Sequence, residues 1–138
     1  MNEEPCYEKE YLKGNGYYDP FLDIIIGNNK FTLYADTGCN SGISISNEQA
    51  KKLDLGEKIT QEPIDVKVAD GHIISADIYI LPIELNGLKR DVEICVIYPE
   101  IKDFKPEEIP PLLGRDFLDH FDVLFKGKDR KIQFFEPK

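Results

Sequence analysis

Residues 31–42 read FTLYADTGCNSG, an apolar run that ends in an acid and a tight turn. The run 31–35 is typical of a buried strand, and Asp36 follows it directly. A bare carboxylate is costly to bury, so Asp36 needs hydrogen-bond donors or a partner charge around it. Gly38 allows the backbone to turn and to come close to the carboxylate. These residues predict a carboxylate held at the end of a strand, and the simpler alternative is an ordinary turn after a strand.

Two motifs together resemble a known family. The Asp-Thr-Gly of residues 36–38 resembles the active-site signature of aspartic proteases. Residues 112–118, LLGRDFL, resemble the run that leads into the C-terminal helix of retroviral-type proteases, the retropepsins. Two motifs in this order are more specific than either one alone, and the matching pattern spans most of residues 21–136. The resemblance implies that the catalytic residues are Asp36, Thr37 and Gly38.

The composition places the chain among soluble globular proteins. Its 138 residues fit one domain, and 41% hydrophobic and 31% charged residues are ordinary values for that class. The net charge of −9 argues against nucleic acid as a partner, and no apolar run is long enough to span a membrane. The first residues lack the pattern of a signal peptide, and three widely spaced cysteines form neither a disulfide framework nor a zinc pattern. A cytoplasmic protein without cofactor or metal is therefore expected.

The periodicity predicts a mostly-β domain with one or two short helices. Strands are expected at residues 21–26, 30–35, 64–68, 73–85, 91–97, 122–125 and 130–135. A hairpin turn is expected at Asn86-Gly87. One helix is expected to begin at a capping box of Ser46 and Gln49 and to end near Gly56, and another is expected at residues 115–120. The expected core residues are Ile26, Leu33, Leu112, Leu113, Phe117 and Phe121.

The resemblance adds a tertiary and quaternary expectation. It implies that residues 21–138 form a single closed β-barrel of the retropepsin type, which is dimeric. Residues 1–20 are expected to be a loosely packed N-terminal arm, with a frayed end favoured over a functional role. In retroviral proteases the two chain ends interleave into a sheet at the dimer interface, and residues 131–135 suit such a strand.

The number of Asp-Thr-Gly motifs decides the expected assembly. Peptide hydrolysis by carboxylates needs two of them, one acting as a base on water and the other as an acid on the carbonyl oxygen. This chain has a single Asp-Thr-Gly, so one copy cannot build the pair. A two-fold homodimer would bring Asp36 against its symmetry mate. The family resemblance implies that the Thr37 hydroxyl then bonds across the dimer and holds the two loops rigid.

The substrate-binding residues are expected in two segments. The strands at 64–68 and 73–80 with their Gly-bearing tip resemble the flap hairpin that closes over substrate in aspartic proteases. The residues before the second motif correspond to a wall of the cleft in that family. The expected substrate is an extended peptide with apolar side chains, bound by Ala69, Asp70, Gly71, His72, Pro110, Pro111 and Leu112. The simpler alternatives are a solvated loop for His72 and a rigid loop entering a core strand for residues 110–112.

Structural support is expected from Asn40, Gly114, Arg115 and Asp116. Two positions depart from the family pattern. Cys39 stands where Ala or Ser is usual, and either packs inertly or carries a reactive thiol. Asn40 stands where retroviral members often have an acid that pairs with the arginine of the second motif. An Asn40–Arg115 contact would then be a hydrogen bond without an ion pair, or Arg115 pairs with a different acid.

Three rivals to a general endopeptidase stay open. The same fold can serve as a catalytically silent dimerisation or peptide-binding module, in which Asp36 is retained for structure. The chain can also be a narrow processing enzyme that does not cut generic peptides. A thiol hydrolase based on Cys39 is the third rival, although no histidine is adjacent to it in the sequence.

Overall fold

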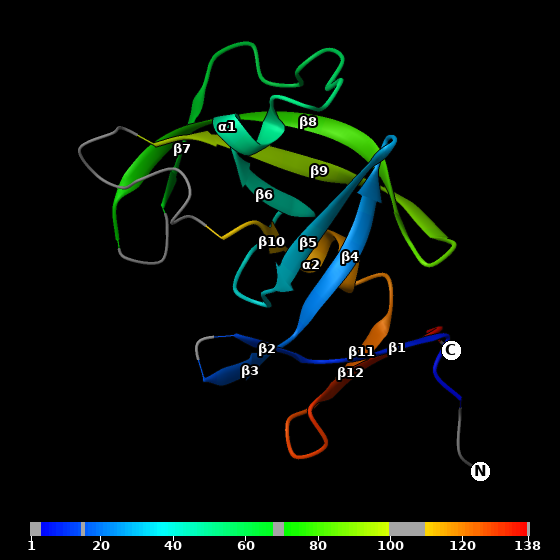
Figure 1. Ribbon diagram of the computed structural model, residues 1–138. Helices are drawn as coiled ribbons and strands as arrows, with labels where there is room; N and C mark the ends of the chain where they lie inside the picture. Colours follow the sequence, from blue (N-terminus) through cyan, green and yellow to red (C-terminus); the bar gives the residue numbers. More distant parts are fainter. Residues whose placement is uncertain (1–3, 15, 68–70, 100–109, 138) are drawn as a thin grey trace.

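The computed structural model describes residues 4–14, 16–67, 71–99 and 110–137, which form strands and two single-turn helices (Figure 1). The strands are β1 (Tyr7–Glu10), β2 (Leu12–Gly14), β3 (Tyr17–Asp19), β4 (Phe21–Ile26), β5 (Asn29–Ala35), β6 (Ile43–Ser46), β7 (Ile64–Lys67), β8 (Ile73–Leu85), β9 (Leu88–Tyr98), β10 (Leu112–Leu113), β11 (Asp122–Lys126) and β12 (Lys131–Phe135), and the helices are α1 (Asn47–Ala50) and α2 (Arg115–Leu118). The expected mostly-β domain with few short helices is confirmed.

The largest sheet has the strand order β4-β5-β10-β6-β9-β8-β7, and β4 also pairs with β8. The long hairpin of β8 and β9 turns at Asn86-Gly87, with Leu85 opposite Leu88. Asn86 and Gly87 have φ angles of 47° and 87°, as a two-residue hairpin turn requires. The expected hairpin is therefore confirmed, while the closed barrel and the dimer stay predictions.

The short strand β10 determines where the Asp36 turn lies. It inserts between β5, which it joins in parallel, and β6, which it joins antiparallel. Leu113 is thus opposite both Ala35, the last residue before the turn, and Ile43, the first residue of β6. A segment from the C-terminal part of the chain therefore fills the gap between the two strands that flank the turn.

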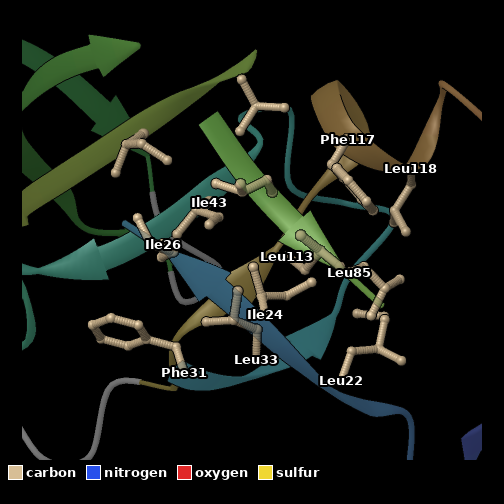
Figure 2. Close-up of a cluster of buried hydrophobic side chains, with 14 of the residues drawn as sticks. Leu22, Ile24, Ile26, Phe31, Leu33, Ile43, Leu85, Leu113, Phe117 and Leu118 are labelled. Atoms are coloured by element: carbon tan, nitrogen blue, oxygen red, sulfur yellow. The ribbon is translucent and has the colours of Figure 1, made fainter. Parts of the chain in front are cut away.

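The core of the domain packs between these strands (Figure 2). Alternate residues of β4, Leu22, Ile24 and Ile26, are buried, as the period of a half-buried strand requires. Five of the six expected core residues, Ile26, Leu33, Leu113, Phe117 and Phe121, are buried. Leu112 is only half-buried, because its neighbour Leu113 takes the inward position on β10.

The expected frayed end is wrong for residues 7–10, which form a strand of a second sheet. Its order is β1-β12-β11, so β1 pairs with the last strand of the chain. Figure 1 shows this sheet at the opposite end of the molecule from the β8–β9 hairpin. The ring of Tyr7 meets the ring of Phe134 edge-on, and Phe134 also contacts Phe117 and Phe121. The aromatic contacts fasten the second sheet to the main core.

Both helices begin where the sequence predicts and end earlier. The capping box is present, because Ser46 accepts the Gln49 amide and the Gln49 side chain accepts the Ser46 amide. The α-helix ends at Ala50. The amide of Leu53 then donates to the Ala50 carbonyl, three residues earlier, as in a 3₁₀ turn. The second helix ends at Leu118 rather than His120. In the described part of the chain, no helix is long and apolar enough to cross a membrane.

Replacing Ile132 by alanine tests the link between the second sheet and the core. Ile132 is fully buried, so Ile132→Ala should lower the free energy of unfolding by about 2–5 kcal/mol. The same substitution at Ile80, which is 52% exposed, should cost less than about 1 kcal/mol. Denaturant unfolding measures both values, and similar losses at the two sites would contradict the assigned packing.

Candidate active site

The Asp36 turn is held by backbone hydrogen bonds from both sides. The Ala35 amide donates to the Pro20 carbonyl at 2.9 Å, and the Asp36 amide donates to the Leu113 carbonyl at 2.9 Å. The carboxylate is half-buried, and its Oδ1 accepts the Gly38 amide at 2.8 Å. The sequence predicted that this carboxylate needs hydrogen bonds or a partner charge, and the Gly38 amide supplies one hydrogen bond.

Gly38 leaves space beside the carboxylate and has no unusual backbone angle. Its φ angle is not among the positive ones, so its backbone lies in a region that other residues adopt. A Cβ atom at this position would lie 3.1 Å from Oδ1 of Asp36. Glycine therefore lets the amide approach the carboxylate closely, as the sequence predicted. Thr37, between the two, is exposed.

The start of α2 supports the loop that follows Asp36. The Gly114 amide donates to the Gly42 carbonyl at 2.8 Å, and the Arg115 amide donates to the Cys39 carbonyl at 2.8 Å. A Cβ atom on Gly114 would lie 2.1 Å from the carbonyl oxygen of Ser41 and 2.8 Å from Sγ of Cys39. The two motifs of the sequence are thus packed against each other with no room for a side chain at residue 114.

Two further side chains join the motifs. Arg115 donates from Nη2 to Oδ1 of Asn40 at 2.6 Å, so the contact is the hydrogen bond without an ion pair that the sequence left open as one alternative. Asp116 accepts the Glu93 amide on Oδ2 at 2.8 Å, which ties α2 to β9. The structure therefore brings together all four residues for which the sequence predicted structural support.

A cleft of about 670 Å³ opens beside the carboxylate. It is lined by Asp36, Gly38, Cys39, Asn40, Ser41, Ser44, Val66, Lys67, Cys95, Ile97 and Leu112. The β7 strand thus contributes to one wall and β10 to another. Within the part of the chain that the structure describes, Asp36 is the only carboxylate that lines the cleft.

Of the residues expected to bind substrate, only some of the described ones line the cleft. Leu112 lines the cleft. Gly71 and His72 lie before β8 and are exposed, while Ala69 and Asp70 fall outside the described residues. The Pro111 carbonyl accepts the Tyr34 amide at 3.0 Å, and Pro110 is exposed. Neither proline is among the residues that line the cleft.

The cleft also contains residues that the sequence reading did not single out. Val66 and Lys67 come from the arm of the β7–β8 hairpin rather than from its tip, and Ile97 comes from β9. The alternation of apolar and polar residues predicted that these residues lie in strands. Alternation does not show which side chains of a strand face the cleft. Across the described residues, no three His, Cys, Asp or Glu side chains gather as a metal site requires.

Burial makes the cysteines of the cleft poor nucleophiles. It raises the pKa of the Cys39 thiol above its ordinary value, and it raises the pKa of Cys95 to about 11. A thiolate is the nucleophilic form, and little of it forms near neutral pH when the pKa is raised. Cys39 therefore has the character of a small packed side chain.

The fold is shared with a solved retroviral protease. The structure of the EIAV protease complexed with the inhibitor HBY-793 matches this chain with a TM-score of 0.57 and 17% sequence identity. The match covers 78% of this chain and 92% of that chain. At this identity the likeness shows the fold alone. The fold and the Asp-Thr-Gly turn define the retropepsin-like class.

The family model of the gag-polyprotein putative aspartyl protease matches residues 22–120. The match covers well over half of the chain, which therefore belongs to this family. The resemblance to retropepsin-like aspartic proteases is thus confirmed. No curated protein matches the chain.

A methyl group at residue 114 tests the packing of the two motifs. Gly114→Ala should lower the free energy of unfolding by about 1–3 kcal/mol, because the new atom overlaps the Ser41 and Cys39 carbonyls. Gly127→Ala is the matched control, since no atom lies within 4 Å of its added Cβ. Denaturant unfolding compares the two variants. Equal stability of both would contradict the close packing of Gly114.

Proposed function

We propose that the chain is a homodimeric aspartic endopeptidase. One observation carries the proposal: in a member of an aspartyl protease family, the Asp36 carboxylate lies at a cleft and is positioned by the Gly38 amide. The fold of a retroviral protease supports it. Asp36 would be the catalytic carboxylate, with Thr37 and Gly38 completing its loop.

The second carboxylate would come from a second copy. Asp116, the acid of the second motif, is engaged by the Glu93 amide and does not line the cleft. Among the described residues that line the cleft, Asp36 is the only carboxylate, and its symmetry mate would supply the second one of a pair. Two carboxylates about 3 Å apart do not both ionise, and the pair holds one proton between them.

The paired carboxylates would hydrolyse a peptide bond without a covalent intermediate. The ionised carboxylate takes a proton from water, whose oxygen attacks the peptide carbonyl carbon. The protonated carboxyl donates its proton to the carbonyl oxygen, which gives a neutral tetrahedral diol. The carboxyl that took the proton from water then donates it to the nitrogen, while the other carboxylate takes a proton from a diol hydroxyl. The C–N bond breaks, a carboxylic acid and an amine leave, and the pair again holds one proton. Each carboxylate thus acts once as acid and once as base.

The walls of the cleft favour an extended substrate with apolar side chains. Val66, Ile97 and Leu112 present apolar surface near the carboxylate. The β7–β8 hairpin would act as the flap and add strand-type hydrogen bonds to the bound peptide, with Gly71 and His72 beside its tip. Thr37, exposed on the turn, would bond to the partner's loop. The proposed site of action is the cytoplasm.

Cleavage of an unbiased peptide library by the wild type and by Asp36→Asn tests the mechanism, with mass measured by light scattering. The variant should lose cleavage by at least about 100-fold, because an amide cannot act as a base. Asp91→Asn, on the exposed surface of β9, is the control and should cut normally. Cleavage by a dimer that Asp36→Asn abolishes supports the proposal.

The other outcomes point to the rivals. A dimer that cuts nothing would favour a silent binding module or a narrow processing enzyme. A monomer that cuts would exclude the shared pair of carboxylates.

Replacing the cleft thiol separates the thiol hydrolase from the aspartic mechanism. Cys39→Ala should keep cleavage within about threefold, because the half-buried thiol has a raised pKa and forms little thiolate. Iodoacetamide at neutral pH should leave the wild type active for the same reason. The assay is the same library digest. Loss of cleavage both in Cys39→Ala and after iodoacetamide treatment would contradict the aspartic mechanism.

A further inference from the structure

One row of side chains crosses the floor of the cleft beside Asp36. On three neighbouring strands, Leu112 of β10 lies opposite Ser44 of β6, and Ser44 lies opposite Cys95 of β9. All three residues line the cleft. Directly opposite residues of paired strands share one face of the sheet. The Ser44 hydroxyl is therefore flanked by an aliphatic side chain and a thiol.

Alternation along β6 turns the Ser44 side chain toward the cleft. Ile43 and Ile45, on either side of it, are fully buried in the main core. Successive side chains of a strand point to opposite faces of the sheet, so Ser44 points away from that core. Its half-buried position and its place in the cleft lining agree with this direction.

The hydroxyl of Ser44 has no hydrogen-bond partner among the residues that the structure describes. Every fully buried side-chain N or O atom of the described residues has a partner, so the Ser44 oxygen is open to solvent. The neighbouring serines differ, because the Ser41 hydroxyl bonds to the Cys95 thiol and Ser46 caps α1. The hydroxyl of Ser44 is thus available to a ligand in the cleft.

A bound peptide changes the environment of this hydroxyl. A substrate that covers the row of Leu112, Ser44 and Cys95 removes solvent from it, and a hydroxyl that loses solvent without a new partner costs free energy. The bound substrate must then supply the missing hydrogen bond. Sites with such a requirement discriminate strongly against an analogue that lacks the hydrogen-bonding group.

We propose that Ser44 is a specificity-determining residue that selects a hydroxyl or carboxamide side chain in the substrate. The substrate residues concerned are serine, threonine, asparagine and glutamine. The inference rests on the proposed function, and it adds one polar requirement to an otherwise apolar extended peptide. A homodimer presents Ser44 twice, so the requirement applies to one position on each side of the scissile bond.

The row favours a neutral substrate group over a charged one. Leu112 carries no charge, and burial raises the pKa of Cys95 to about 11, so its thiol stays neutral near neutral pH. A charged group seated between these side chains would lose solvent without an opposite charge in the row. A hydroxyl or a carboxamide makes the hydrogen bond to Ser44 without that cost.

Pairs of peptides of equal shape test the requirement. Within each pair, threonine replaces valine or asparagine replaces leucine at a single position, and the parent sequences are those that the wild type cleaves best in the library digest. The polar member should have a kcat/KM at least about tenfold higher, at one position on each side of the scissile bond. Both members are measured with one enzyme preparation, so the ratio of the two kcat/KM values does not depend on the fraction of folded protein.

Two variants assign the preference to residue 44. Ser44→Ala removes the hydroxyl and should bring the ratio to within about threefold of one, while Ser44→Thr keeps a hydroxyl and should retain the tenfold ratio. Thr32→Val is the control and should leave the ratio unchanged, because it removes a hydroxyl from the exposed face of β5, where Thr32 bonds to Asp23. Thermal unfolding followed by circular dichroism checks that every variant is folded.

The outcomes distinguish the role of Ser44 from the proposed function. If the wild type cleaves but prefers the polar member at no position, or if Ser44→Ala keeps the preference, the role of Ser44 is overturned and the peptidase stands. If the wild type cleaves nothing, the peptidase is overturned, and the same library is selected for binding to the immobilised protein. Enrichment of hydroxyl and carboxamide residues that Ser44→Ala abolishes then supports the role of Ser44, and its absence overturns that role as well.

Discussion

The hydrogen bond from the Asp36 amide to the Leu113 carbonyl joins the two halves of the site. It closes the gap between β5 and β6 with β10, and the loop carbonyls that follow Asp36 are then satisfied by the first amides of α2. Buried backbone groups need such partners, so neither motif keeps its conformation without the other. This contact holds the Asp36 turn against the segment that enters α2.

Local signals in the sequence predicted local structure well. The hairpin turn at Asn86-Gly87 and the capping box of Ser46 and Gln49 are both present as predicted. Each depends only on residues a few positions apart. Pairing between distant strands had no such signal. The partner of β1 is β12, at the other end of the chain, and alternation along residues 7–10 does not identify it.

The residues of the Asp36 turn could be predicted from the sequence, and most of the other residues that line the cleft could not. Asp36, Gly38 and Gly114 could be found because a short motif fixes their backbone, and their packing follows from it. The cleft residues Val66 and Ile97 could not be assigned, since they meet only after β7, β8 and β9 have paired. The Asn40–Arg115 contact was predictable in part. The sequence pointed to both residues, but it left open whether Arg115 would pair with Asn40 or with an acid.

The position of β10 also sets an order of events during synthesis. A growing chain emerges with its N-terminus first, so residues 31–42 are made well before residues 112–116. Until the later segment arrives, the Asp36 turn lacks the Leu113 carbonyl and the α2 amides that hold it. Contacts between segments so far apart in sequence also form slowly. The carboxylate is therefore assembled into its site only after residues 112–116 have been made.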